Sequence, residues 1–243
     1  MGYVDAELFP RERAELAPGA AHVPDWLPAE RQRELLAACR DWARPPAGLR
    51  TVRTPGGGTM TARQVCLGLH WGVVRACPAC GRPVRDNPGC PGPHQYPYAY
   101  TPTAVDGDGA PVKPFPGRLG EVARRAVADA LGPAAVPGPP YDIALINFYD
   151  GTAHMGMHRD SEERADAPVV SLSLGDTCVF RFGNTETRAR PYTDVELRSG
   201  DLFVFGGPAR AAYHGVPRVH PGTAPPWLGL AGRLNITLRV SGL

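Results

Sequence analysis

The feature that most constrains the fold lies near the C-terminus, in residues 233–240 (RLNITLRV). Every second residue from Arg233 to Arg239 is polar, and every second residue from Leu234 to Val240 is apolar. Because successive side chains of a strand point to opposite faces, the segment is predicted to be a β-strand with one polar face. That face either lies in solvent or lines an anion-binding pocket inside a barrel. The Cα atoms of the two arginines would be about 20 Å apart, so both reach one small dianion only if their side chains lean together.

Short segments rich in β-branched and aromatic residues precede this strand, and turn residues separate them. They occupy residues 142–149, 168–174, 177–182, 194–197 and 202–205. Short strands in series, without intervening helices, predict an antiparallel sandwich or barrel. Apolar residues at helical spacing predict two helices, one near residues 28–43 and one near 119–131. The expected fold class is therefore mainly β with flanking helices (α+β).

Composition narrows the class of protein. The chain has 243 residues and a formal net charge of only +2, which excludes a histone-like polycation. No run approaches the roughly 18 apolar residues that a membrane span needs, and the acidic N-terminus lacks an apolar signal core. We expect a soluble, cytoplasmic protein that does not bind membranes.

A candidate metal site is formed by His158 and Asp160, which one residue separates, and by His214 much later in the chain. An extended backbone points the first two side chains to the same side. Two imidazoles and one carboxylate leave three positions of an octahedral ion open, which is the arrangement of non-haem Fe(II) oxygenases. The arginine-bearing strand strengthens this hypothesis, since a dicarboxylate co-substrate needs a cationic partner. The other histidines are expected at the surface: His22, His70, His94, His154 and His220.

Two further polar residues, Asn147 and Tyr149, share a strand face with Ile143 and Leu145. A purely structural strand would continue apolar at these positions. The two side chains either line the same pocket as the arginines or mark a strand end that emerges into solvent.

In order along the chain, the most distinctive segments are LINFY (145–149), MHRD (157–160), PVVSLSLG (168–175), GDLFVFGG (200–207), YHG (213–215) and RLNITLR (233–239). This ordered set resembles the AlkB family of Fe(II)- and 2-oxoglutarate-dependent dioxygenases. A weaker resemblance extends upstream to about residue 60, through Cys66, Trp71, residues 98–102 and residues 114–116.

The resemblance implies a double-stranded β-helix, or jelly roll, with iron held by His158, Asp160 and His214. It implies that Arg233 pairs with the distal carboxylate of 2-oxoglutarate, and that the rest of the co-substrate pocket consists of Asn147, Tyr149, Asn235 and Arg239. A bidentate arginine suits a carboxylate better than a lysine does. The co-substrates would be 2-oxoglutarate and O2, with succinate and carbon dioxide as products.

Family members of this kind oxidise a methyl group on a base nitrogen and release formaldehyde, which repairs DNA damage directly. The resemblance implies 1-methyladenine and 3-methylcytosine in DNA as substrates, with RNA as a second polymer. The base must be flipped out or come from a single strand. Trp71, Tyr98 and Tyr100 would belong to a substrate lid, and Glu162 would lie near the base. Ordinary packing is the alternative for these aromatic residues.

The chain departs from the family pattern between Trp71 and Tyr98. This insertion carries Cys77, Cys80, Cys90 and His94, whose spacing is that of a zinc knuckle. Three thiolates and one imidazole would form a closed structural zinc site that stiffens the lid. A flexible, proline-rich loop with incidental cysteines is one alternative, and a redox role or a different metal is the other.

Three regions are expected along the chain. Residues 1–59 form an N-terminal extension, residues 60–117 a substrate-recognition lid with the Cys-rich insertion 72–97, and residues 118–243 a helix plus the dioxygenase core. The leading hypothesis is a monomeric oxidative demethylase acting on alkylated DNA. One alternative is a dioxygenase acting on a protein, lipid or small molecule. The other is a catalytically silent nucleic-acid-binding module, which the complete triad disfavours.

Overall fold

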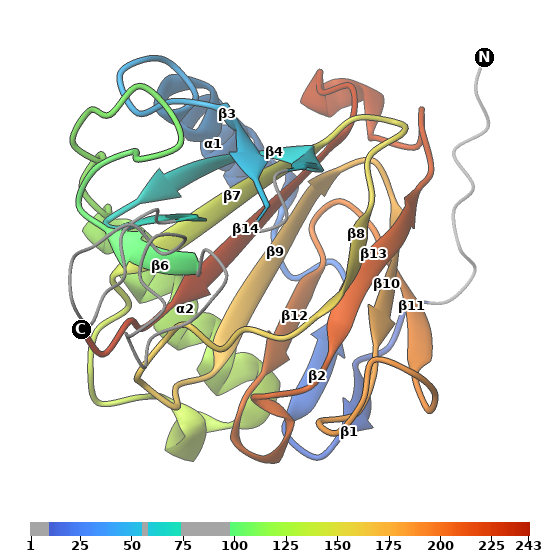
Figure 1. Ribbon diagram of the computed structural model, residues 1–243. Helices are drawn as coiled ribbons and strands as arrows, with labels where there is room; N and C mark the ends of the chain where they lie inside the picture. Colours follow the sequence, from blue (N-terminus) through green and yellow to red (C-terminus); the bar gives the residue numbers. More distant parts are fainter. Residues whose placement is uncertain (1–9, 55–57, 74–97) are drawn as a thin grey trace.

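The computed structural model describes residues 10–54, 58–73 and 98–243, and two facing β-sheets dominate it (Figure 1). The eight-stranded sheet has the order β1 (Ala14–Ala17), β2 (Ala20–Val23), β12 (Leu202–Phe205), β9 (Val169–Gly175), β14 (Arg233–Arg239), β7 (Ile143–Tyr149), β4 (Thr59–Leu67) and β3 (Arg50–Arg53). The four-stranded sheet has the order β11 (Thr193–Leu197), β10 (Cys178–Phe182), β13 (His214–Val219) and β8 (Met155–His158). A separate two-stranded ribbon, called here the β5–β6 ribbon, pairs β5 (His70–Val73) with β6 (Tyr98–Thr101).

All paired strands in the two sheets and the ribbon are antiparallel. In the large sheet β12, β9, β14 and β7 are consecutive neighbours, and they face the four strands of the small sheet. This double-sheet arrangement is a jelly roll. The predicted fold class, mainly β with flanking helices, is therefore confirmed.

The predicted arginine strand, β14, lies in the middle of the large sheet between β9 and β7. All seven of its residues are buried, so the interpretation of its polar face as a solvent-exposed surface is wrong. The polar face meets polar neighbours instead, because Asn235 lies opposite Asn147 on one side and opposite Ser173 on the other. The polar side of the strand therefore lines the interior between the sheets.

The apolar face of β14 packs against two helices on the outside of the large sheet (Figure 1). Helix α2 (Gly117–Leu131) buries Leu119, Ala123, Ala126, Val127 and Ala130, which recur at helical spacing on one side. It ends at Gly132, whose φ of +94° favours glycine, and Pro133 follows. Helix α1 (Ala29–Trp42) buries Leu35, Leu36 and Cys39 in the same core. Each large aliphatic side chain buried here contributes about 1.5–3 kcal/mol.

The inner faces of the two sheets form a second hydrophobic core. Phe180 and Phe182 of the small sheet pack against Phe203 and Phe205 of the large sheet, with ring centroids 4.8–5.7 Å apart. This aromatic layer fixes the spacing between the sheets. Within the described ranges, short 3₁₀ helices occupy Pro133–Ala135, Gly207–Ala209 and Pro226–Leu228.

Strands from all three regions named from the sequence share the large sheet. β2 of the N-terminal extension pairs with β12, and β4 pairs with β7. The buried Asp201 accepts hydrogen bonds from Arg11 and lies 2.9 Å from His22, which fastens the extension to the core. His22 is thus buried, and its predicted surface position is wrong. No helix of the described residues is both long and apolar enough to cross a membrane.

Candidate active site

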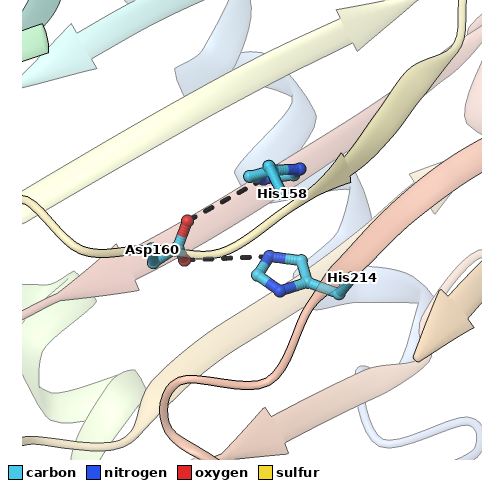
Figure 2. Close-up of side chains that lie close together, drawn as sticks. All are labelled: His158, Asp160 and His214. Atoms are coloured by element: carbon cyan, nitrogen blue, oxygen red, sulfur yellow. Dashed lines mark ion pairs between the residues drawn. The ribbon is translucent and has the colours of Figure 1, made fainter. Parts of the chain in front are cut away.

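Three side chains that could hold a metal ion come together where β8 meets β13. His158 ends β8 and His214 begins β13, and the two residues are direct partners in the antiparallel register. Asp160 follows β8, and the candidate ligand atoms of all three side chains lie within 4.8 Å of one another (Figure 2). Each histidine Nε2 lies 3.8 Å from a carboxylate oxygen of Asp160. Strand pairing therefore brings together the residues that the sequence predicts as iron ligands.

Both histidine rings are oriented by backbone carbonyl groups. The Nδ1 of His158 lies 2.9 Å from the oxygen of Gly156, and the Nδ1 of His214 lies 3.0 Å from the oxygen of Ala212. Because a carbonyl oxygen only accepts, Nδ1 donates the hydrogen in each pair. The Nε2 of the neutral ring, which faces Asp160, then keeps its lone pair for a metal ion.

The electrostatics of the triad favour the metal-binding protonation states. Burial, together with the neighbouring His158, lowers the pKa of His214 to about 4, so this imidazole is neutral near pH 7. Burial is the largest influence and would raise the pKa of Asp160, but the charge of Arg239 and those of other neighbouring groups together outweigh it and hold the pKa at about 2. A neutral imidazole and an ionised carboxylate are the forms that coordinate a divalent cation.

A buried network of charges holds Asp160 in place. Nη2 of Arg239 lies 2.7 Å from Asp160, and its Nη1 donates to Glu163 at 2.7 Å. Arg210 donates to Glu163 at 2.9 Å and to the backbone oxygen of Asp160 at 3.1 Å. Tyr100 donates to the same glutamate from β6. Two nitrogens of Arg239 are thus engaged with carboxylates, and its part in co-substrate binding stays a prediction.

Arg233, at the opposite end of β14, has spare donors. Its side chain is 1% exposed and donates from Nη2 to Ser173 at 3.0 Å, while Nε and Nη1 have no acceptor among the described residues. The guanidinium carbon lies 5.5 Å from the centre of the Tyr149 ring. A buried guanidinium without a counter-charge is costly. The site therefore fits an anion with two acceptor oxygens, such as the distal carboxylate of 2-oxoglutarate.

Between the two arginines, amide side chains form the cavity wall. Asn147 donates to Asn235 at 3.4 Å, and Asn235 donates to Ser171 at 2.6 Å. Gln64 of β4 donates to Asn147 at 3.0 Å. Gln64, Asn147, Tyr149 and Asn235 line one cavity of about 520 Å³ together with the triad and both arginines. Gln64 was not predicted from the sequence. The available signal was a polar residue directly before the apolar residues Val65, Cys66 and Leu67 of β4.

The mouth of this cavity is aromatic. Trp71 of β5 and Tyr98 of β6 stack with ring centroids 4.0 Å apart and planes at 15°, and both line the cavity. Glu162 lines it as well, and its charge adds to burial in raising the pKa of Tyr98. Tyr100 bonds instead to the buried network behind Asp160. The structure therefore brings Trp71, Tyr98 and Glu162 to the cavity and Tyr100 to the network.

Glu163 and Arg210, which hold the network together, were missed because nothing in their local sequence indicates partners so far along the chain. The predicted zinc ligands Cys77, Cys80, Cys90 and His94 lie outside the described residues.

A jelly roll that carries two histidines and an aspartate on one face defines the class of non-haem iron oxygenases. A family model for the 2OG-Fe(II) oxygenase superfamily matches residues 19–239. The AlkB protein of Salmonella typhimurium is 33% identical over 197 residues, covering 78% of this chain and 76% of the relative. The solved structure of OsALKBH1 superposes with a TM-score of 0.73 at 28% identity, covering 93% of this chain and 100% of that one. The chain belongs to the AlkB family of this superfamily.

The relatives differ in length and in name. An alpha-ketoglutarate-dependent dioxygenase AlkB homolog from Caulobacter vibrioides is 48% identical over 105 residues, 42% of this chain. That match spans 46% of the Caulobacter protein, less than half its length. Other relatives are named DNA N(6)-methyladenine demethylase in Arabidopsis thaliana and tRNA demethylase in Schizosaccharomyces pombe.

Proposed function

We propose that this chain is an oxidative demethylase that repairs N-methylated bases in nucleic acid, using Fe(II), 2-oxoglutarate and O2. The observation that carries the proposal is one cavity with two kinds of wall. Its floor holds the triad and a buried arginine with spare donors, and its mouth holds a stacked aromatic pair. The products would be the unmethylated base, formaldehyde, succinate and carbon dioxide.

Different residues of the floor would bind the metal ion and the co-substrate. His158, Asp160 and His214 would hold Fe(II), which together with 2-oxoglutarate and O2 supplies the oxidising chemistry when bound. Arg233 would bind the distal carboxylate of 2-oxoglutarate, with Asn147, Tyr149 and Asn235 completing the wall around it. Arg239 keeps Asp160 ionised and oriented, and Glu163 pairs with the same arginine. The aromatic layer behind His214 keeps bulk water from this side of the site.

The residues of the mouth suit a methylated base. Trp71 and Tyr98 offer ring faces on which a flipped or single-stranded base can stack. Glu162 places an acceptor beside them, which favours a base that carries a positive charge, such as 1-methyladenine or 3-methylcytosine. We assign DNA as the first polymer and RNA as the second. The names of relatives support nucleic acid in general, since they include both a DNA and a tRNA demethylase.

The test is product analysis by mass spectrometry. The protein is incubated with ferrous iron, 2-oxoglutarate and air, together with matched single-stranded DNA and RNA oligonucleotides that carry one methylated base. The proposal expects loss of the methyl group together with equimolar formaldehyde and succinate. Succinate formation that no methylated oligonucleotide stimulates would contradict it, and would point to a protein, lipid or small-molecule substrate.

The proposal includes a structural zinc ion bound by Cys77, Cys80, Cys90 and His94, and a monomeric, cytoplasmic protein. Protein purified without added metal should contain zinc close to one per chain, and Cys77→Ser should lose it. An absence of zinc from the wild-type protein would remove this part of the proposal and leave the iron site untouched.

A further inference from the structure

A second cluster of buried charges lies at the base of the β5–β6 ribbon, away from the triad. Its centre is Arg50 of β3, whose side chain is only 8% exposed. The guanidinium donates from Nε to Asp106 at 2.6 Å and from Nη2 to the backbone oxygen of Trp71 at 2.5 Å. It also donates to the side chain and the backbone oxygen of Gln64, both at 3.3 Å. One side chain therefore connects β3, β4, β5 and the loop that follows β6.

Asp106 and His70 complete the cluster. The Asp106 side chain is 3% exposed and lies 2.6 Å from Nε2 of His70, which is 2% exposed. Burial alone would raise the pKa of Asp106, but the hydrogen bond from His70 and the charge of Arg50 hold it at about 2. The predicted surface position of His70 is wrong, because this ion-paired partner lies in a distant loop. The cluster is thus a closed set of paired buried groups.

The cluster is hydrogen-bonded to the backbone of Trp71, a residue of the cavity mouth. The carbonyl oxygen of Trp71 accepts from Arg50, and its N–H donates to Sγ of Cys66 at 3.4 Å. Within the ribbon Trp71 pairs with Tyr100, and its ring stacks on Tyr98. Both backbone polar groups of Trp71 are therefore held by residues that the chemistry of the triad does not use.

We propose that Arg50 is a positioning residue that, with Asp106 and His70, fastens the β5–β6 ribbon to the large sheet and so holds Trp71 at the cavity mouth. The proposal rests on the proposed function for its substrate, a methylated base. Arg50 acts through Trp71 and touches neither the triad nor Arg233.

The hydrogen bonds of Arg50 predict which Michaelis constant changes when its side chain is removed. Arg50 reaches the co-substrate wall only through Gln64, which donates to Asn147, while Asn147 keeps its own bond to Asn235. Loss of Arg50 therefore affects the mouth far more than the floor. Since a hydrogen bond to a charged group is worth about 1.5–3 kcal/mol, KM for a methylated oligonucleotide should rise about 10- to 100-fold, with less than about a twofold change in KM for 2-oxoglutarate.

The experiment compares Arg50→Met with Arg53→Met, which removes an exposed arginine from the same strand. Amide hydrogen exchange is measured first, on the protein without metal, co-substrate or oligonucleotide. Arg50→Met should speed exchange in β5 and β6 and leave β14 unchanged, while Arg53→Met should match the wild type. Both KM values are then measured with the iron-loaded enzyme.

Arg50→Met leaves Asp106 with one partner fewer and could unfold the chain. The double variant Arg50→Met/Asp106→Asn removes both charges and serves in its place if the single variant does not fold. Unchanged exchange in β5 and β6, or equal rises in both KM values, would overturn the proposal. If exchange rises but the wild type demethylates no oligonucleotide, the proposed substrate is wrong, and the fastening of the ribbon stands on the exchange data.

Discussion

The floor and the mouth of the cavity are built in different ways. The floor is carried by β14, β7 and β9, three central neighbours of the large sheet, and by the paired β8 and β13 of the small sheet, and its polar side chains are nearly all buried. The mouth is carried by a separate two-stranded ribbon, and its aromatic side chains are half-buried. The register of paired strands fixes the floor residue by residue, whereas stacking and a few bonds from one arginine position the mouth. Chemistry should therefore depend on the floor and substrate choice on the mouth.

The two ends of β14 show a second contrast within the floor. Arg239 has two nitrogens on carboxylates, so its charge orients an iron ligand. Arg233 keeps two nitrogens without an acceptor among the described residues, so its charge is available to an incoming anion. The two arginines on one strand face thus have different surroundings, while a part of Arg239 in co-substrate binding stays a prediction.

The largest effect is expected from His158→Ala. Loss of one of three ligands should abolish iron-dependent turnover, because the two remaining side chains cannot complete the facial set. The His158 side chain is 36% exposed, so the thermal unfolding temperature should change little. Asp160→Ala is a less clean test, since it would leave the buried Arg239 without one counter-charge. Full succinate formation by His158→Ala, with exposed His154→Ala as the matched control, would refute the assigned floor.

Arg233→Met should act on the co-substrate alone. Loss of a charge-assisted bond worth about 1.5–3 kcal/mol raises KM for 2-oxoglutarate about 10- to 100-fold. Arg233→Lys keeps the positive charge without the planar guanidinium, so its KM for 2-oxoglutarate should lie between those of the wild type and Arg233→Met. The measurement is succinate formation against 2-oxoglutarate concentration, with Arg218→Met on the exposed side of β13 as control. An equal effect of both methionine variants would show that Arg233 does not bind the co-substrate.

Trp71→Ala tests the mouth. Base stacking on an aromatic side chain is worth about 1–3 kcal/mol, so KM for a methylated oligonucleotide should rise about tenfold or more, with KM for 2-oxoglutarate unchanged. Trp71→Phe should lose less, because it keeps a ring face. Trp227→Ala removes an exposed tryptophan outside the cavity and should match the wild type. If the Trp71→Ala enzyme has a normal KM for the oligonucleotide, the Trp71 ring does not take part in substrate recognition.

The smallest effect is an acid dependence of stability. The pKa of Asp106 is about 2 in the folded chain against an ordinary value of 3.8. Below about pH 4 the unfolded chain takes up a proton that the folded chain does not, so stability falls as the pH drops from about 4 to about 2. Asp160 and Asp201 add to this fall, as their pKa values are also about 2. Urea unfolding should show a shallower fall in Asp106→Asn than in the wild type or in exposed Asp166→Asn, and equal slopes would argue against the buried pairing.

The floor could be predicted from the sequence because its information is local. Alternation along residues 233–240 fixed which side chains share a face, and the His-x-Asp spacing placed two ligands on one side. What the sequence left open was strand order, which decides whether the polar face of β14 meets solvent or another polar strand. That choice depends on pairings with β9 and β7, which are distant in the chain.

The mouth and the charge networks were less predictable for the same physical reason. Glu163 contacts Arg239, and His70 contacts Asp106, only because the tertiary fold brings them together, and no local sequence pattern encodes this. The burial of His22 and His70 depends on Asp201 and Asp106, which lie far from them in the sequence. Glu162 and Glu163 are adjacent in sequence, yet one lines the cavity and the other is buried behind Asp160.

We expect a metal ion on the triad and the guanidinium of Arg233 to bind 2-oxoglutarate together. The test is titration calorimetry with Fe(II)-loaded protein in the absence of O2, so that 2-oxoglutarate binds but is not turned over. 2-Oxoglutarate should bind the loaded wild type, and His158→Ala and Arg233→Met should both bind it much more weakly. Equal affinity in the wild type and Arg233→Met, or equal affinity with and without the metal ion, would contradict it.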